Sequence, residues 1–135
     1  MDLQSLLIAW KEEYNVGIDV IDRQHQSLVR QIRRFQEAML DGRAVQLRDE
    51  LMVRLLGYIE FHFRFEERLM AEAGYVDLDA HKAQHSALTN QVLNLQRRIK
   101  QHEEIASPEV MRFLRHWLTG HIMKSDQKFS QARRK

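Results

Sequence analysis

Histidine and carboxylate residues recur along this chain of 135 residues at spacings that suit metal binding. His62 and Glu66 are four residues apart, and His81 and His85 repeat that spacing further along. Residues four apart project from the same face of a helix, so each pair presents two ligand groups together. The same two residue types recur at three further positions, namely His25, His121 and Asp126. Imidazole and carboxylate are ligands for divalent cations, and a metal ion is therefore one reason for their presence.

Four helices must position these groups, because apolar residues recur three and four apart in four successive segments. The first predicted helix begins with an N-cap at Asp19 and stops at Asp41-Gly42, and the second ends at Gly74. The third is predicted to begin at Asp77. The fourth begins at Ser107-Pro108-Glu109 and runs towards Phe129. Short loops between amphipathic helices predict an all-α fold, an antiparallel up-down four-helix bundle. We expect one domain over residues 1–135, with an extended N-terminal arm over 1–18 and the bundle over 19–133.

The histidines lie on helix faces that a bundle normally fills with apolar side chains. A single histidine there is most simply a hydrogen-bonded core residue, but five facing one interior cannot all be satisfied by apolar neighbours. A buried, unpaired Glu66 would also cost several kcal/mol, and a divalent cation removes both penalties. On an ideal helix Asp126 would point roughly 140° away from His121. That direction is awkward for one metal ion and reasonable for a carboxylate that bridges two.

Composition excludes several other classes of site. The chain has no cysteine, which rules out disulfides, thiolate zinc sites and cysteine nucleophiles. Its net charge of +2 is too balanced to require a nucleic-acid partner. The longest apolar run near the N-terminus, Leu6 to Trp10, is too short for a signal peptide or a membrane span. We therefore expect a cytoplasmic protein with no membrane span.

Four motifs occur in order, one in each predicted helix. They are Trp10-x3-Tyr14-x-Val16-Gly17-Ile18-x2-Ile21-Asp22-x-Gln24-His25, then His62-x3-Glu66-Glu67, then His81-x3-His85, and finally Trp117-Leu118-x2-His121-Ile122-x3-Asp126. Over positions 10–126 the chain resembles the hemerythrins, and more closely the bacterial single-domain bacteriohemerythrins. All seven ligand positions of that family pattern hold the expected residue type.

The resemblance implies a non-haem centre of two iron ions that binds dioxygen reversibly and is not an enzyme. One iron would be held by His81, His85 and His121, and the other by His25 and His62. Glu66 and Asp126 would bridge the two together with an oxide or hydroxide, which leaves the second iron an open position. The residues that line this open position in the family correspond here to Leu28, Trp117, Leu118 and Ile122. These four are also ordinary core residues of a bundle.

Two other functions compete with an oxygen carrier, store or sensor. A di-iron oxidase or peroxidase of the ferritin-like kind uses Glu-x-x-His motifs, and this chain contains none. A zinc or signalling module also suits an imidazole-rich site, and metal analysis distinguishes it. Nitric oxide binding or iron handling would use the same seven ligands as dioxygen binding.

Four aromatic residues surround His62 in the sequence, and the sequence does not show which of them pack against the site. They are Tyr58, Phe61, Phe63 and Phe65. The remaining histidines, His102 and His116, have mostly polar or charged neighbours, and we expect them to face solvent.

Overall fold

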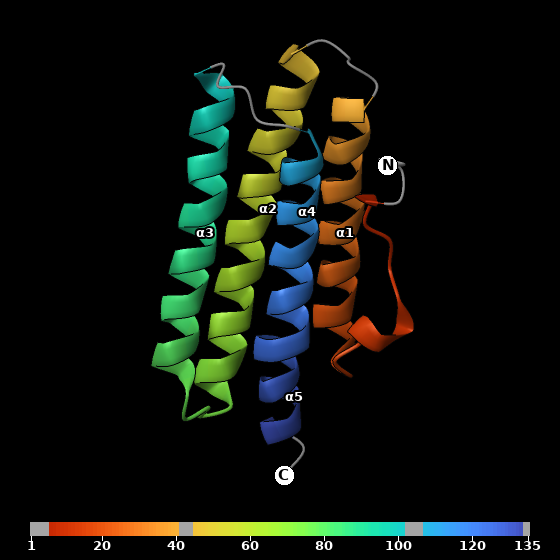
Figure 1. The fold of residues 1–135 in the computed structure, drawn as a ribbon. Coiled ribbons are helices and arrows are strands. Elements are labelled where there is room, and N and C mark those ends of the chain that lie inside the picture. The colour runs from red at the N-terminus through yellow and green to blue at the C-terminus, as the bar shows by residue number, and fades with distance from the viewer. Residues whose placement is uncertain (1–5, 41–44, 102–106, 134–135) are drawn as a thin grey trace.

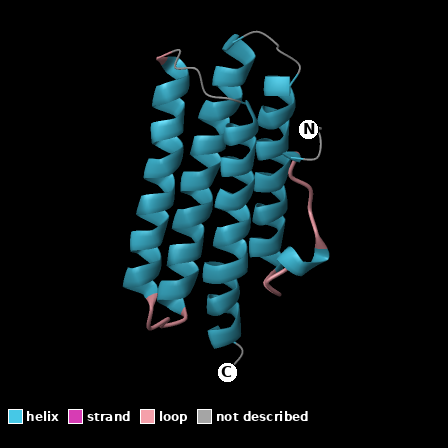
Figure 2. Cartoon of the chain, in the orientation of Figure 1, coloured by secondary structure: helices cyan, strands magenta, loops and turns pink. Residues whose placement is uncertain are grey.

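The computed structural model describes residues 6–40, 45–101 and 107–133, except for the side chains of 45–48, 107, 122–123 and 133. Within these ranges the chain is helical apart from the N-terminal arm and the connections between helices (Figures 1 and 2). In chain order the elements are the 3-10 helix Glu12–Tyr14, α1 Asp19–Leu40, α2 Val45–Glu72, α3 Leu78–Lys100, α4 Ser107–Gly120, a π-helix His121–Asp126, and α5 Gln127–Arg133. The predicted antiparallel four-helix bundle is therefore confirmed, with α4, the π-helix and α5 forming its fourth member.

Several helix ends agree with the sequence prediction to within two residues. Asp19 is the first residue of α1 rather than the residue before it. Gly74, with φ of +67°, follows the end of α2, because glycine enters the left-handed region without steric cost. Asp77 precedes α3, but its side chain makes no capping hydrogen bond and pairs with Lys128 of α5 at 3.1 Å. The predicted stop at Asp41-Gly42 lies outside the described residues.

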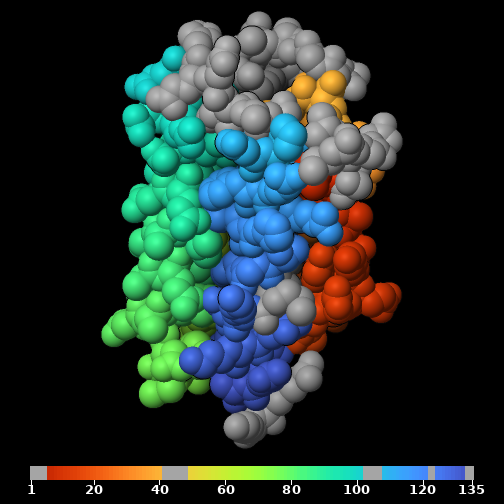
Figure 3. All heavy atoms as spheres, in the orientation of Figure 1, coloured from red at the N-terminus to blue at the C-terminus, as the bar shows by residue number. Residues whose placement is uncertain are grey.

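The four members of the bundle enclose one apolar core. Residues that are fully or almost fully buried come from every member, including Ile32, Ile59, Val92 and Leu114. In the space-filling view α3 and α4 form most of the visible face, and α2 is nearly hidden behind them (Figure 3). Among the described residues, no helix is long and apolar enough to cross a membrane.

The N-terminal arm runs along the bundle beside α1 (Figure 1). Buried Gln36 of α1 holds it in place: its amide oxygen accepts a hydrogen bond from the backbone N–H of Ile8 at 2.9 Å. The same amide donates to the carbonyl of Met111 in α4, also buried, at 3.2 Å. One side chain thus ties the arm to two helices, and the predicted extended arm is modified only by its short 3-10 turn.

Asp22 fixes the entry of the arm into α1. Its carboxylate accepts hydrogen bonds from the backbone N–H groups of Val16 at 2.7 Å and Gly17 at 3.2 Å. These contacts give partners to backbone N–H groups just before the helix. They also place the negative charge of Asp22 in the first turn of α1, where the helix dipole favours it. The same contacts fix where α1 begins, which places His25 in the second turn of this helix.

Candidate metal centre

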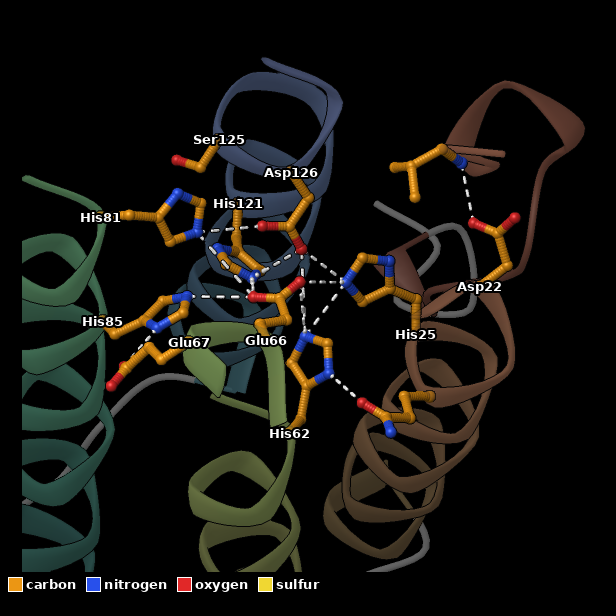
Figure 4. A network of polar contacts seen from close by, with 12 residues as sticks. Asp22, His25, His62, Glu66, Glu67, His81, His85, His121, Ser125 and Asp126 are labelled. Atoms are coloured by element: carbon orange, nitrogen blue, oxygen red, sulfur yellow. Dashed lines mark hydrogen bonds and ion pairs between the residues drawn. The ribbon is translucent and has the colours of Figure 1, made fainter. Parts of the chain in front are cut away.

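Seven ionisable side chains from all four members of the bundle meet in its interior (Figure 4). Each is at most 4% exposed, and they are the residues named from the sequence: His25 on α1, His62 and Glu66 on α2, His81 and His85 on α3, and His121 and Asp126 on the π-helix. The structure therefore brings every proposed ligand to one place.

Two carboxylates occupy the middle of this cluster. Glu66 lies 3.1 Å from Nε2 of His85 and 3.3 Å from Nε2 of His62, which are on different helices. Asp126 lies 2.7 Å from Nε2 of His25 and 3.2 Å from Nε2 of His81. Each carboxylate thus contacts imidazoles on both sides of the cluster, as Figure 4 shows.

The donor atoms form two overlapping groups, each spanning no more than 4.8 Å. One group comprises His25, His62, Glu66, His121 and Asp126, and the other comprises His81, His85, His121 and Asp126. His121 belongs to both, and its ring centre is 5.2 Å from that of His85 and 5.8 Å from that of His62. The distances accommodate two neighbouring cations, with His121 within reach of either.

Several of these buried atoms have no hydrogen-bond partner among the described residues. They include both carboxylate oxygens of Asp126, Oε1 of Glu66, and Nε2 of His81, His85 and His121. These atoms are close to one another, yet their geometry does not make hydrogen bonds. Atoms that converge without pairing are aimed at a shared position between them, and burying them unpaired is costly. The residues therefore fit a bound cation.

Without a metal, protons on imidazole must balance the two buried carboxylates. Burial disfavours the charged form of His121, but Asp126 and Glu66 outweigh this and raise its pKa to about 10. Burial acts likewise on His81, and the same two carboxylates raise its pKa to about 8. Burial lowers the pKa of His62. Burial raises the pKa of Glu66, but the imidazoles of His62 and His121 reverse this and hold it well below its ordinary value.

A second layer of residues fixes the histidine rings. Nδ1 of His62 lies 2.7 Å from the amide oxygen of Gln24, and Nδ1 of His85 lies 2.7 Å from the carboxylate of Glu67. With these acceptors the proton sits on Nδ1, which leaves the Nε2 lone pair for a metal. Neither residue had an expected role from the sequence. Each stands in one of the quoted motifs, next to a proposed ligand, and that position was the signal that could have identified it.

Phe63 is the aromatic residue that packs against the site. Its ring stacks on His85 with centres 3.9 Å apart and planes 4° apart, and it lies 6.2 Å from the ring of Trp117. Phe61, two residues earlier, is 52% exposed and points away from the core. The Phe63 ring covers one face of the His85 ring, and the Glu67 carboxylate accepts from its Nδ1–H, so these two residues together orient this imidazole.

The π-helix overturns the predicted direction of Asp126. The expectation of roughly 140° between His121 and Asp126 assumed a regular α-helix. The structure instead has i→i+5 geometry over His121–Asp126, in which residues five apart are stacked on the same side. Nε2 of His121 and Oδ2 of Asp126 are consequently 2.9 Å apart.

The apolar residues proposed for a ligand pocket lie close to the histidines in sequence, and the three whose side chains are described are buried. Leu28 follows His25 by one turn, and Trp117 and Leu118 precede His121 by one turn. The indole N–H of Trp117 donates to the carbonyl of Leu88 at 3.0 Å, which joins α4 to α3. Ile122 is within the π-helix, and its side chain lies outside the described residues.

Comparison with known proteins places this site in a family. The family model described as the hemerythrin HHE cation binding domain matches residues 16–132, which include all seven side chains. The chain belongs to the hemerythrin family. This membership confirms the resemblance found in the motifs and agrees with a cluster built to hold cations.

Relatives in the hemerythrin family match along most of their length. The chain is 34% identical to a bacteriohemerythrin of Stenotrophomonas maltophilia over 124 residues, which are 92% of this chain and 80% of that protein. It is 30% identical to a bacteriohemerythrin of Methylococcus capsulatus, over 90% of this chain and 92% of that one. The crystal structure of a wild-type hemerythrin superimposes with a TM-score of 0.83 at 28% identity, covering 93% of this chain and 96% of that one.

Proposed function

We propose that the chain holds two iron ions and binds dioxygen reversibly without turning it over. The observation that carries this proposal is the buried cluster of five imidazoles and two carboxylates whose donor atoms converge in two overlapping groups. Nitrogen and oxygen ligands of this kind suit iron. When bound, the two irons supply the redox chemistry by which dioxygen is taken up and released.

In the proposed arrangement the histidines divide between two irons. His81, His85 and His121 hold one iron, and His25 and His62 hold the other. Glu66 and Asp126 would be ligands shared by the two irons. The support for bridging is that each carboxylate contacts imidazoles of both sets. The iron with two histidines has fewer protein ligands and keeps a position for dioxygen.

The surroundings of that open position decide whether dioxygen is released unchanged. We assign this role to Leu28, Trp117, Leu118 and Ile122. The described members of this set are buried, and the two leucines carry no group that could donate a proton. Excluding water and acids protects the bound oxygen from reduction to products that leave irreversibly.

The alternative functions can be compared by the ligands that each would use. A ferritin-like oxidase centre contains more carboxylates, whereas five of the seven proposed ligands here are imidazoles. Nitric oxide binding or iron handling remains compatible with the same ligands and is separated from dioxygen binding only by experiment. Whether dioxygen is carried, stored or sensed depends on partners and conditions outside this site.

The test begins with metal content and proceeds to gas binding. Protein from iron-replete medium is expected to contain two irons per chain, and zinc in their place would contradict the proposal. The protein is then reduced without air, given a measured amount of oxygen, and purged. Uptake of one dioxygen per iron pair and recovery of the reduced spectrum support the proposal. Continuous consumption of oxygen with a reductant, at about one per second or faster, would assign the protein to the oxidases.

A matched pair of leucine variants tests the pocket. Leu118→Ala opens a cavity one turn from His121, and Leu114→Ala makes the same change one turn further away; both leucines are fully buried. We expect both variants to keep two irons. Only Leu118→Ala should lose the oxygenated spectrum faster in air, because it admits water near the open position. Equal rates would remove Leu118 from the pocket.

A further inference from the structure

The outer face of α1 and α2 carries two adjoining grooves that lie apart from the metal ligands. Their volumes are about 490 and 380 Å³, and Gly57 and Phe61 line both. A Cβ atom placed on Gly57 would meet nothing within 4 Å, so the floor is open where the grooves join. Because they share these two residues, the two grooves adjoin along α2 and are treated together as one channel.

Arginine dominates the charge of this channel. Its lining contains five arginines and one glutamate, namely Arg30, Arg34, Arg54, Arg64, Arg68 and Glu60. This is a net charge of +4, against +2 for the whole chain. Arg64 pairs with Glu60 at 2.6 Å, whereas Arg30, Arg34 and Arg54 make no ion pair with the rest of the described chain. As far as the described residues go, three guanidinium groups are thus available to an outside anion.

Aromatic rings line the same channel. Phe61 is 52% exposed, and its ring centre is 5.5 Å from that of Tyr58 and 6.4 Å from that of Phe65. Tyr58 and Phe65 are half-buried, so Phe61 is the ring that this group presents to solvent. An apolar group that reaches the surface in this way is typical of an interaction site. Arginines surround these aromatic side chains, and an apolar centre with a polar rim is the usual arrangement of a protein–protein interface.

The spacing of the lining residues on α2 suits a helical partner. Leu51, Arg54, Tyr58, Phe61, Phe65 and Arg68 follow one another at alternating intervals of three and four residues. This is the spacing by which one helix packs along another. The inner face of α2 repeats the same intervals with core residues, so α2 presents one such stripe to the bundle and a second one outward.

We propose that this channel docks an amphipathic helix of a partner protein, with apolar residues on the aromatic stripe and carboxylates on Arg30, Arg34 and Arg54. Guanidinium groups bind carboxylates in a bidentate manner, which gives the contact direction as well as charge. Docking of this kind is the helix-in-groove mode of recognition. The proposal does not depend on which gas or metal the interior holds.

Two other occupants fit the channel less well. A second copy of this chain related by two-fold symmetry would set one +4 surface against another, which is repulsive. A nucleic acid would be attracted by the arginines, but binding along a phosphate backbone does not require the alternating intervals of the apolar stripe. Both are outcomes that the experiment distinguishes.

The experiment uses the iron-loaded full chain and a designed peptide of about three heptads, with leucine along one face and glutamate beside it. A second peptide replaces each glutamate with lysine. We expect the acidic peptide to bind and gain helical circular dichroism, and the basic peptide to fail. Binding should weaken as salt rises, since the carboxylate contacts are exposed.

Matched variants locate the binding. Arg34→Glu and Phe61→Ser should each lower the affinity for the acidic peptide about tenfold or more. Arg97→Glu makes the same charge reversal, and Leu93→Ser a comparable loss of an exposed apolar side chain, on α3; both should leave binding of the acidic peptide unchanged. No binding, or equal loss in all four variants, overturns the proposal. So does tighter binding of a single-stranded oligonucleotide, or self-association in sedimentation that Arg34→Glu alters.

Discussion

His121 and Asp126 are five residues apart in the chain and 2.9 Å apart in space, because the segment between them is π-helical. Their relationship parallels that of His62 and Glu66, which are four apart on regular α-helix and 3.3 Å apart. The π-helix therefore accommodates one additional residue while keeping both side chains on the same side of the helix. Such single-turn π segments occur frequently at functional sites.

Changing the length of this turn tests its role. Deletion of Lys124, an exposed residue of the π-helix, leaves His121 four residues before the carboxylate. A regular α-helix then keeps them on one face, and we expect close to two irons per chain. Insertion of one alanine after Lys124 makes the spacing six, about 240° around an α-helix, and we expect loss of bound iron. Iron analysis of the purified variants measures this, and equal retention would contradict the π-helical argument.

Removing a hydrogen-bond acceptor behind a histidine is expected to weaken metal binding. Glu67→Ala leaves Nδ1 of His85 without the acceptor now 2.7 Å away, and Gln24→Ala does the same to His62. Loss of such partners costs about 10- to 100-fold in metal affinity. The rate of iron release to a chelator measures the change. Glu72→Ala, an exposed residue on the same helix as Glu67, is the control and should release iron at the original rate.

The metal-free protein should lose stability as the pH rises above about 6.5. The pKa of His81 is raised to about 8 and that of His121 to about 10, from an ordinary value of 6.5. A group whose pKa is raised by folding contributes stability that is complete below the unfolded pKa and is lost as the pH passes the folded pKa. The free energy of unfolding in urea should therefore fall between pH 6.5 and about 10.

The iron-loaded protein is the control for this pH dependence. Its ligand imidazoles have already released their protons to bind metal, so the same decline should be absent. Metal binding at pH 7 should accordingly release protons into a weakly buffered solution. A flat stability profile for the metal-free protein over this range would show that the two histidines are not protonated in the folded state.

Truncation of two phenylalanines on one helix should have effects of very different size. Phe63→Ala removes a buried ring that stacks on His85, and we expect it to cost about 3–5 kcal/mol. Phe61→Ala removes a ring that is 52% exposed, and we expect a change within about 0.5 kcal/mol. Urea unfolding of the metal-free proteins measures both. Similar costs would mean that Phe63 contributes little to the packing of the site.

The sequence by itself determined the helices, their approximate ends and the residue types of the candidate centre. Helix ends were readable because glycine and acidic residues act locally, as Gly74 does at the end of α2. The histidines were readable because buried polar groups on an apolar face require a common partner. Both signals depend only on neighbours along the chain.

Only the tertiary structure decided how those residues meet. The direction of Asp126 depends on a π-helix that periodicity alone does not reveal. The choice of Phe63 rather than Phe61 as the ring against His85 depends on how α2 is rotated toward α3. Gln24 and Glu67 acquire their partners across two helices, at 2.7 Å in each case. Contacts between helices are set by packing of the whole bundle, and no local pattern records them.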